Sequence, residues 1–176
     1  RAGLRLLHCA AESGSHKVVQ YLLAGGTDVN AADGEGRTAL HYVCKEKTAA
    51  GPPAKTTKRR PAPRFRSLPQ YLEVAQILVN HGGLVNKPDR YGKTPLISAA
   101  ENGAVEAAGY LLSLGASVHA KDSNKMTPLH HAALQGFCDV ARLLIFTGAS
   151  LESTAKGPWT DGVTALHLAS ENGHAA

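Results

Sequence analysis

The stretch Thr127-Pro128-Leu129-His130-His131-Ala132 decides the fold, because other segments of the chain repeat its pattern. The pattern Thr-(Pro/Ala)-Leu returns at 38–41, 94–97 and 164–167, and a weaker copy reads Arg5-Leu6-Leu7-His8. The step is 33 residues from position 5 to 38 and again from 94 to 127. It is longer by 23 residues between 38 and 94, and by four between 127 and 164. A fixed period of this length predicts a stack of similar supersecondary units.

Each copy carries the residues that begin and end two short helices. Threonine caps a helix N-terminus, and the proline that can follow it loses only a donor that would be unpaired there. A glycine nine residues later favours a left-handed C-terminal cap, which limits the first helix to roughly two turns; these glycines are Gly14, Gly103, Gly136 and Gly173. Apolar residues at helical spacing predict second helices over 17–24, 73–80, 105–113 and 139–146. A second glycine ends each of them, and a polar stretch such as 30–36 predicts a hairpin-like turn.

Two helices this short cannot bury their apolar faces alone, so neighbouring copies must stack. The signature at 127–132, together with Gly26-Thr27-Asp28-Val29-Asn30, resembles ankyrin repeats over about 150 of the 176 residues. The resemblance implies an all-α solenoid of helix-turn-helix units with hairpin-like turns, about 4.5 repeats in a single array over 1–176. The expected repeats are 1–33, 34–89 with an insert at 47–69, 90–122, 123–155 and a truncated 156–176. Because the first copy is weak and the last is short, we expect a larger array.

Composition and charge limit the classes of function. Only 5% of residues are aromatic, which favours a helical core of Leu, Val, Ile and Ala over a β-sandwich. The net charge of +5 comes from residues 47–72, which hold seven basic and no acidic residues; the remainder has twelve basic against fourteen acidic, a net −2. No run approaches the roughly 20 apolar residues of a membrane span, and no signal peptide is visible. We therefore expect an intracellular protein, cytoplasmic or nuclear, without membrane insertion.

The residues that suggest chemistry fit structural roles better. His8, His41, His130 and His167 each take the fourth place of the signature, where the family resemblance implies hydrogen bonds within and between repeats. The other histidines lack zinc-ligand spacing, so we expect no metal. Cys9 and Cys44 are expected to be small buried residues, since no base accompanies them. The glycines recur at the repeat period and form no phosphate loop, which argues against a cofactor, a small-molecule ligand and an enzyme.

Asn30 is the one candidate for covalent modification. It closes the pattern Leu22…Asp28-Val29-Asn30, which resembles the sites that asparaginyl hydroxylases modify in ankyrin repeats. The alternative is that Asn30 only braces its turn.

The resemblance also implies that a partner protein binds in a concave groove formed by the turn tips and the exposed side of the first helices. The candidate turn residues are Glu35, Arg37, Arg90, Tyr91, Lys93, Asn124 and Met126, with Trp159 and Asp161 in the lengthened last turn. The candidate first-helix residues are Glu12, Ser13, Lys45, Glu46, Glu101, Asn102, Leu134, Gln135, Glu171 and Asn172. These positions vary between copies, as in a protein-interaction scaffold, although each could simply be solvated.

The insert 47–69 supports an alternative function. It holds five of the nine prolines and the cations Lys55, Lys58, Arg59, Arg60, Arg64 and Arg66, which oppose helix formation and predict a disordered loop. The segment 55–66 could bind an anionic surface or nucleic acid, or serve as a nuclear import signal, or be only a solvated insertion. The slightly acidic repeats disfavour nucleic-acid binding. A third alternative is a regulatory module of an enzyme whose catalytic domain lies outside this sequence.

Trp159 gives the first testable prediction, because a large apolar ring in a polar, exposed turn is typical of an interface anchor. Trp159→Ala is expected to weaken partner affinity by about 2 kcal/mol or more, as for a hot-spot residue. The affinity is measured by titration calorimetry, and circular dichroism checks that the variant stays folded. Unchanged affinity in a folded variant would remove Trp159 from the binding surface.

Overall fold

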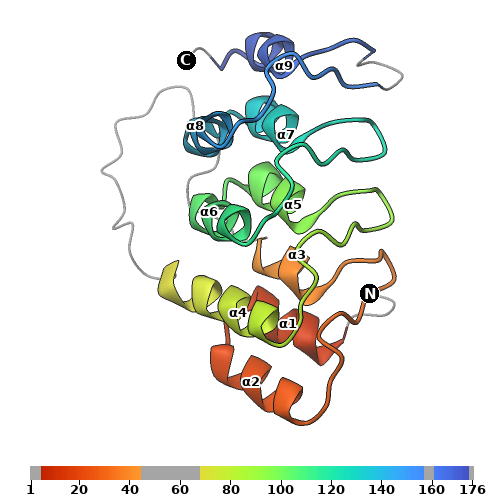
Figure 1. Cartoon of the computed structure of the whole chain (residues 1–176), viewed down its shortest axis with the longest axis vertical. Coiled ribbons are helices and arrows are strands. Elements are labelled where there is room, and N and C mark those ends of the chain that lie inside the picture. Colours follow the sequence, from red (N-terminus) through yellow and green to blue (C-terminus); the bar gives the residue numbers. More distant parts are fainter. Residues whose placement is uncertain (1–4, 45–67, 157–160, 175–176) are drawn as a thin grey trace.

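The computed structural model describes residues 5–44, 68–156 and 161–174 (Figure 1). Within these ranges the chain forms helices and turns and no strand. The helices are α1 (Leu6–Glu12), α2 (His16–Ala24), α3 (Ala39–Val43), α4 (Leu68–Asn80), α5 (Pro95–Asn102), α6 (Val105–Ser113), α7 (Pro128–Gln135), α8 (Cys138–Phe146) and α9 (Ala165–Glu171). The expected all-α architecture is confirmed.

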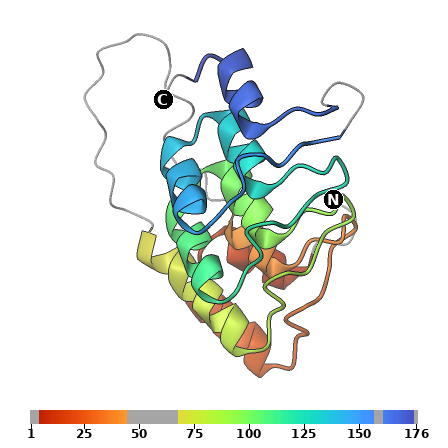
Figure 2. The ribbon, with the colours of Figure 1, turned by 45° about the horizontal axis from the view of Figure 1, so that its top comes forward.

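The helices stack in two columns. Each first helix packs on the next one, in the order α1, α3, α5, α7 and α9, and the second helices α2, α4, α6 and α8 pack in the same way. Figure 1 shows the turns that join successive repeats projecting to the same side of the stack, and they stay along one edge in the tilted view of Figure 2. The chain is therefore a solenoid in which each repeat contacts mainly its neighbours.

The caps expected from the sequence begin and end the helices. Thr38, Thr94, Thr127 and Thr164 are the N-cap residues of α3, α5, α7 and α9, each with extended backbone. Gly103 and Gly136 follow α5 and α7 in the left-handed conformation, with φ of 73°. The second helices lie where apolar periodicity placed them, with one correction. Helix α4 begins at Leu68, so the last two residues expected in the insert, 68 and 69, belong to its first turn, where proline is tolerated.

The leucine of the signature forms the centre of each contact between repeats. Leu7, Leu40, Leu96 and Leu129 are at most 2% exposed, because the following repeat covers them. Burying one such side chain contributes about 2 kcal/mol. The equivalent residue of α9, Leu166, is 78% exposed, since no described element packs beyond it. Coverage by the neighbour, and not the helix itself, removes this leucine from water.

Aspartates shape the hairpin turns between repeats. Asp33, Asp89 and Asp122 each accept hydrogen bonds at one carboxylate oxygen from the backbone N–H groups two and four residues later, at 2.8–2.9 Å. Backbone hydrogen bonds then join adjacent turns. The Arg90 N–H donates to the Glu35 carbonyl at 2.9 Å, and the Ser123 N–H donates to the Tyr91 carbonyl at 2.9 Å. The Lys156 N–H donates to the Asn124 carbonyl at 2.7 Å. The turns therefore form a continuous ladder held in register.

The tip of each turn needs a left-handed residue close to the next turn. Gly36 and Gly92 have φ of 79° and 76°, and a Cβ added to either would lie 3.0 Å from a backbone nitrogen of the following turn. Lys125 takes the equivalent place in the third turn with φ of 59°, the one positive φ of a non-glycine residue in the described part. A side chain in this conformation costs roughly 1–2 kcal/mol.

Two glycine substitutions should separate backbone strain from the close approach of the turns. Gly115 has φ of 82° but nothing within 4 Å of an added Cβ, so Gly115→Ala should destabilise only through strain, by about 1 kcal/mol. Gly92→Ala adds a clash with the Ser123 nitrogen and should cost about 1 kcal/mol more. Urea unfolding measures both free energies. Equal losses would mean that the turns have room to separate.

Candidate protein-binding surface

We call the turn tips together with the exposed residues of the first helices the front face. Of the candidate residues, Glu12, Ser13, Arg90, Tyr91, Asn124, Asp161, Glu171 and Asn172 are exposed, and Glu35, Arg37, Lys93, Glu101, Asn102, Leu134 and Gln135 are half-buried. Lys45, Glu46, Trp159 and the basic residues of the insert lie outside the described residues. Every described candidate except Met126 is thus at least partly exposed, and the role of these residues in binding stays a prediction.

Met126 is the candidate that the structure removes from this surface. Its side chain is buried in a small apolar cluster with Ala155 and Leu168, packed beside Leu134 and Val163. The residue lies immediately before Thr127, the N-cap of α7. The prediction that Met126 is an exposed turn-tip residue is therefore wrong, because one residue along a hairpin changes the side of the backbone.

The two cysteines of the first helices differ in their surroundings. Cys44 is buried as expected, and burial raises the pKa of its thiol to about 12, which keeps it protonated. Cys9 is exposed, so the expectation that it is buried is wrong. The equivalent positions in later repeats are covered by the hairpin that precedes the helix, as Tyr42 is by Asp33. No described hairpin precedes α1.

Glu35, Arg90 and Tyr91 form one network across two neighbouring turns. Arg90 Nη1 lies 3.1 Å from Glu35 Oε1, and the Tyr91 hydroxyl donates to Glu35 Oε2 at 2.7 Å. The guanidinium carbon of Arg90 lies 5.7 Å from the centre of the Tyr91 ring. The Tyr91 hydrogen bond, followed by the charge of Arg90, lowers the pKa of the Glu35 carboxyl. These three side chains are therefore pre-positioned by one another.

Arg37 and Lys93 are also paired with carboxylates. Arg37 Nη2 lies 2.8 Å from Asp33 Oδ2, which accepts a 2.7 Å hydrogen bond from the Tyr42 hydroxyl as well. Burial opposes ionisation of Asp33, but the bonds from Tyr42 and Arg37 hold the pKa of its carboxyl well below the usual range. Lys93 Nζ lies 2.8 Å from Glu101, which joins a turn to the first helix α5.

The buried imidazoles connect consecutive repeats through a defined tautomer. Nδ1 of His8, His41 and His130 accepts a hydrogen bond from the N–H of the cap residue three positions earlier. A backbone N–H can only donate, so Nδ1 is unprotonated and Nε2 carries the hydrogen of the neutral ring. Nε2 then donates to a carbonyl of the following hairpin, that of Ala31, Lys93 or Val163, at 3.0, 3.0 and 3.2 Å. The expected bonds within and between repeats are confirmed for these three rings. Nδ1 of His167 likewise accepts a hydrogen bond from the Thr164 N–H at 3.2 Å, but among the described residues no hydrogen bond joins this exposed ring to another repeat.

The third repeat lacks this connection. Ile97 replaces the histidine there and is fully buried. Its backbone N–H bonds to the hydroxyl of the cap Thr94 at 3.4 Å, but its side chain has no donor for the next hairpin. Apolar packing alone fills this place between α5 and α7.

Two features around the fourth repeat were not predicted from the sequence. His131 Nε2 lies 2.9 Å from Asp122 Oδ2, with both side chains at most 6% exposed. Burial opposes ionisation of Asp122, but His131 and two backbone N–H groups lower the pKa of its carboxyl. Lys125 is exposed at the turn tip between the candidates Asn124 and Met126. The signals were an aspartate five residues before Thr38, Thr94 and Thr127, and a lysine where the three other turns have glycine.

Asn30 braces the loop that follows α4. Its side-chain amide donates to the Gly82 carbonyl at 2.9 Å and accepts from the Leu84 N–H at 2.8 Å. Asn86 makes the equivalent pair of bonds to Gly115 and Ser117, at 3.1 and 2.9 Å. The structural role of Asn30 is thus shown, and its hydroxylation stays a prediction.

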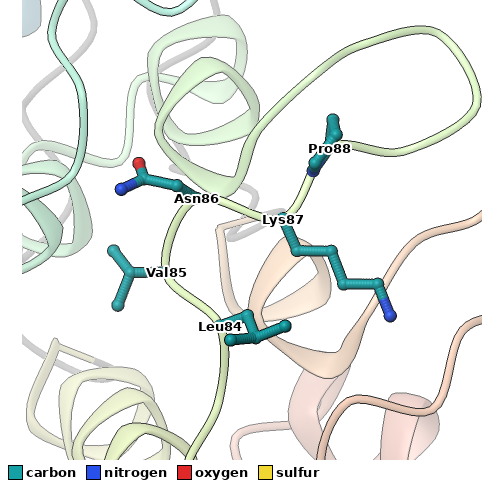
Figure 3. A pocket seen from close by; sticks show the side chains of 5 residues that line it. All are labelled: Leu84, Val85, Asn86, Lys87 and Pro88. Carbon is teal, nitrogen blue, oxygen red and sulfur yellow. The ribbon is translucent and has the colours of Figure 1, made fainter.

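An open depression lies at the loop Leu84–Pro88, lined by five consecutive residues. Figure 3 shows that Val85 and Asn86 leave the chain on the opposite side from Lys87, so these side chains do not converge on one point. Lys87 Nζ donates to the Asn30 carbonyl at 2.9 Å. In the part of the chain that the structure describes, no three His, Cys, Asp or Glu side chains could hold a metal ion, and no helix is long and apolar enough to cross a membrane.

Comparison with known proteins agrees with this geometry. A family model described as ankyrin repeats (many copies) matches residues 7–47 and 98–145, which together make up half of the chain. The chain belongs to the ankyrin-repeat family. Ankyrin repeats are generally protein–protein interaction modules and typically non-catalytic scaffolds.

Two human ankyrin-repeat proteins are similar to part of this chain. Rabankyrin-5 is 33% identical over 100 residues, which are 56% of this chain and 7% of rabankyrin-5. Diacylglycerol kinase iota is 32% identical over 108 residues, which are 60% of this chain and 8% of the kinase. The similarity thus spans less than a tenth of either relative.

The imidazole connections predict a loss of stability in mild acid. Burial lowers the pKa of His8, His41 and His130 below 6.5 in the folded chain, so the unfolded chain takes up protons first as pH falls. The contribution of these histidines to the free energy of unfolding is complete above pH 6.5. It is lost as the pH falls through their pKa values in the folded chain, at up to about 1.4 kcal/mol per pH unit for each histidine. Asp33 and Asp122 have lowered pKa values, so their contribution is lost only at more acidic pH.

Urea unfolding between pH 7 and pH 5 measures this slope. His41→Gln should give a smaller slope, because the amide can still donate to the Lys93 carbonyl but does not titrate. His119→Gln, at an exposed position, is the control and should keep the slope of the unchanged protein. Equal slopes in all three proteins would contradict the proposed role of the buried rings.

Proposed function

We propose that this array is a scaffold that holds a partner protein against its front face. The observation that supports the proposal is the ladder of turns. Backbone hydrogen bonds keep the tips in register, so differences between Glu35, Tyr91 and Asn124 are presented side by side on one continuous edge. The signature leucines behind this edge are the same in every repeat. Repeat proteins build extended binding surfaces in this way, with the same buried residues in each repeat and different residues at the exposed turn tips.

The pairing of the turn residues favours tight binding by a rigid surface. Glu35, Arg37, Arg90 and Lys93 are held by neighbouring carboxylates, cations or hydroxyls. A side chain that is already fixed loses less rotamer freedom when a partner arrives, which lowers the entropic cost of association by about 0.5–1.5 kcal/mol for each such residue. The front face therefore needs little rearrangement to bind.

Within a larger protein, the array would deliver its partner to other domains. The matched region is a small part of both relatives, and one of them is named as a kinase of diacylglycerol. This similarity supports a module that works beside further domains, including the case of a catalytic domain outside this sequence. The proposed binding of a partner protein at the front face is the same whether or not the further domains include a catalytic one.

Site-specific photo-crosslinking tests the proposal. A photoreactive benzoyl-phenylalanine at Asn124 or Gln135 on the front face should crosslink a defined protein from cell extract. The same group at Gln20 or Arg142, exposed on the second helices α2 and α8, provides the matched control and should not crosslink that protein. A crosslink from α2 and α8 alone would assign binding to the opposite face and overturn the proposal.

A further inference from the structure

The cations of the front face fall into two groups. In the second and third repeats, Arg37, Arg90 and Lys93 each lie within 3.1 Å of a carboxylate of the array. In the third turn and at the start of the next one, Lys121, Lys125 and Lys156 are exposed, and no described carboxylate pairs with them. We call these three residues the lysine edge.

The backbone brings the lysine edge together. Lys125 N–H donates to the Asp122 carbonyl at 2.9 Å, so Lys121 and Lys125 flank one tight turn. Lys156 N–H donates to the Asn124 carbonyl at 2.7 Å, which places its backbone beside the tip that carries Lys125. The edge is therefore formed by two adjacent rungs of the ladder and not by a mobile run of charges.

The nearest acidic group in the turn is already occupied. Asp122 is buried, with one oxygen bonded to the N–H groups of Asn124 and Met126 and the other to His131. It cannot turn outward to meet a lysine without giving up these bonds. The positive charge of the edge is thus left for an anion from outside the array.

Lys125 adds a second observation that points outward. It occupies the left-handed tip position that Gly36 and Gly92 fill without strain in the two preceding turns. Strained backbone positions tend to persist at sites of function, because the surrounding structure holds them for what they present. Here the strained residue presents an ammonium group at the most prominent point of the turn.

We propose that the lysine edge binds an acidic segment of the partner protein, a deepening that rests on the proposed scaffold function. The segment carries Asp or Glu residues that meet Lys121, Lys125 and Lys156, while its remaining residues lie along Asn124 and Gln135 of the front face. A continuous polyanion fits less well. Asp161 and Glu171 are exposed in the next repeat and would repel its phosphates, whereas a peptide can place its charges separately.

Selection from a phage library of random dodecapeptides, with the whole chain immobilised, tests this proposal. The recovered peptides should be enriched in Asp and Glu, and their binding, followed by fluorescence anisotropy, should weaken as salt rises. The combined substitution Lys121→Glu, Lys125→Glu and Lys156→Glu should weaken binding by about tenfold or more, since three attractive pairs become repulsive. Peptides with Lys in place of their acidic residues should regain affinity for this variant.

The control variant carries Lys17→Glu and Arg142→Glu on α2 and α8, and it should bind the acidic peptides as the unchanged chain does. Circular dichroism confirms folding of both variants. If the recovered peptides are not enriched in Asp and Glu but still bind at Gln135, the acidic-segment proposal is overturned and the scaffold function stays intact. Recovery of no peptide at the front face would count against both. Tighter binding of a single-stranded oligonucleotide than of the acidic peptides, lost in the lysine variant, would assign the edge to nucleic acid instead.

Discussion

The whole array depends on one apolar flank being covered by the next repeat. Each first helix is only about two turns long, and a helix of this length is not stable by itself in water. Leu7, Leu40, Leu96 and Leu129 become buried only because another helix pair packs over them, while Leu166 shows the same position uncovered. The alanines beside them, such as Ala99 and Ala100, are small enough for the helices to approach closely. Folding of one repeat is therefore tied to the presence of its neighbour.

Polar groups add direction to this packing. Apolar contact alone would allow repeats to slide or rotate, but three imidazoles bind carbonyls of the next hairpin and the turn tips bond to one another. Each of these bonds has a fixed geometry, and every buried side-chain nitrogen and oxygen in the described residues has a partner. The regular spacing of the front face therefore depends on the hydrogen bonds of the imidazoles and of the turn backbones.

Much of the fold could be predicted because the local signals and the repeat period agreed. Threonine caps and left-handed glycines act within a few residues, so their effect can be read without knowing tertiary contacts. The surface was harder to predict, since exposure depends on what lies across the array. Met126 is buried by Ala155 in the last turn and by Leu168 of the following repeat, whereas Cys9, on the first described helix, is exposed. Lys125 could be recognised only by comparing the turns with one another, because its signal is that glycine is missing at this position of the repeat.

Ile97 has a mechanical consequence for the stack. Between α3 and the second hairpin, and between α7 and the last one, an imidazole ties the helix to the hairpin beyond it. At α5 the isoleucine leaves only dispersion contacts at this point, with the Ser123 bonds to Tyr91 acting at the outer edge. Dispersion falls off steeply once surfaces part, whereas hydrogen bonds keep a preferred direction. Among the described residues, the joint beyond α5 therefore has no directional side-chain bond in its interior, whereas the joints beyond α1, α3 and α7 each have one.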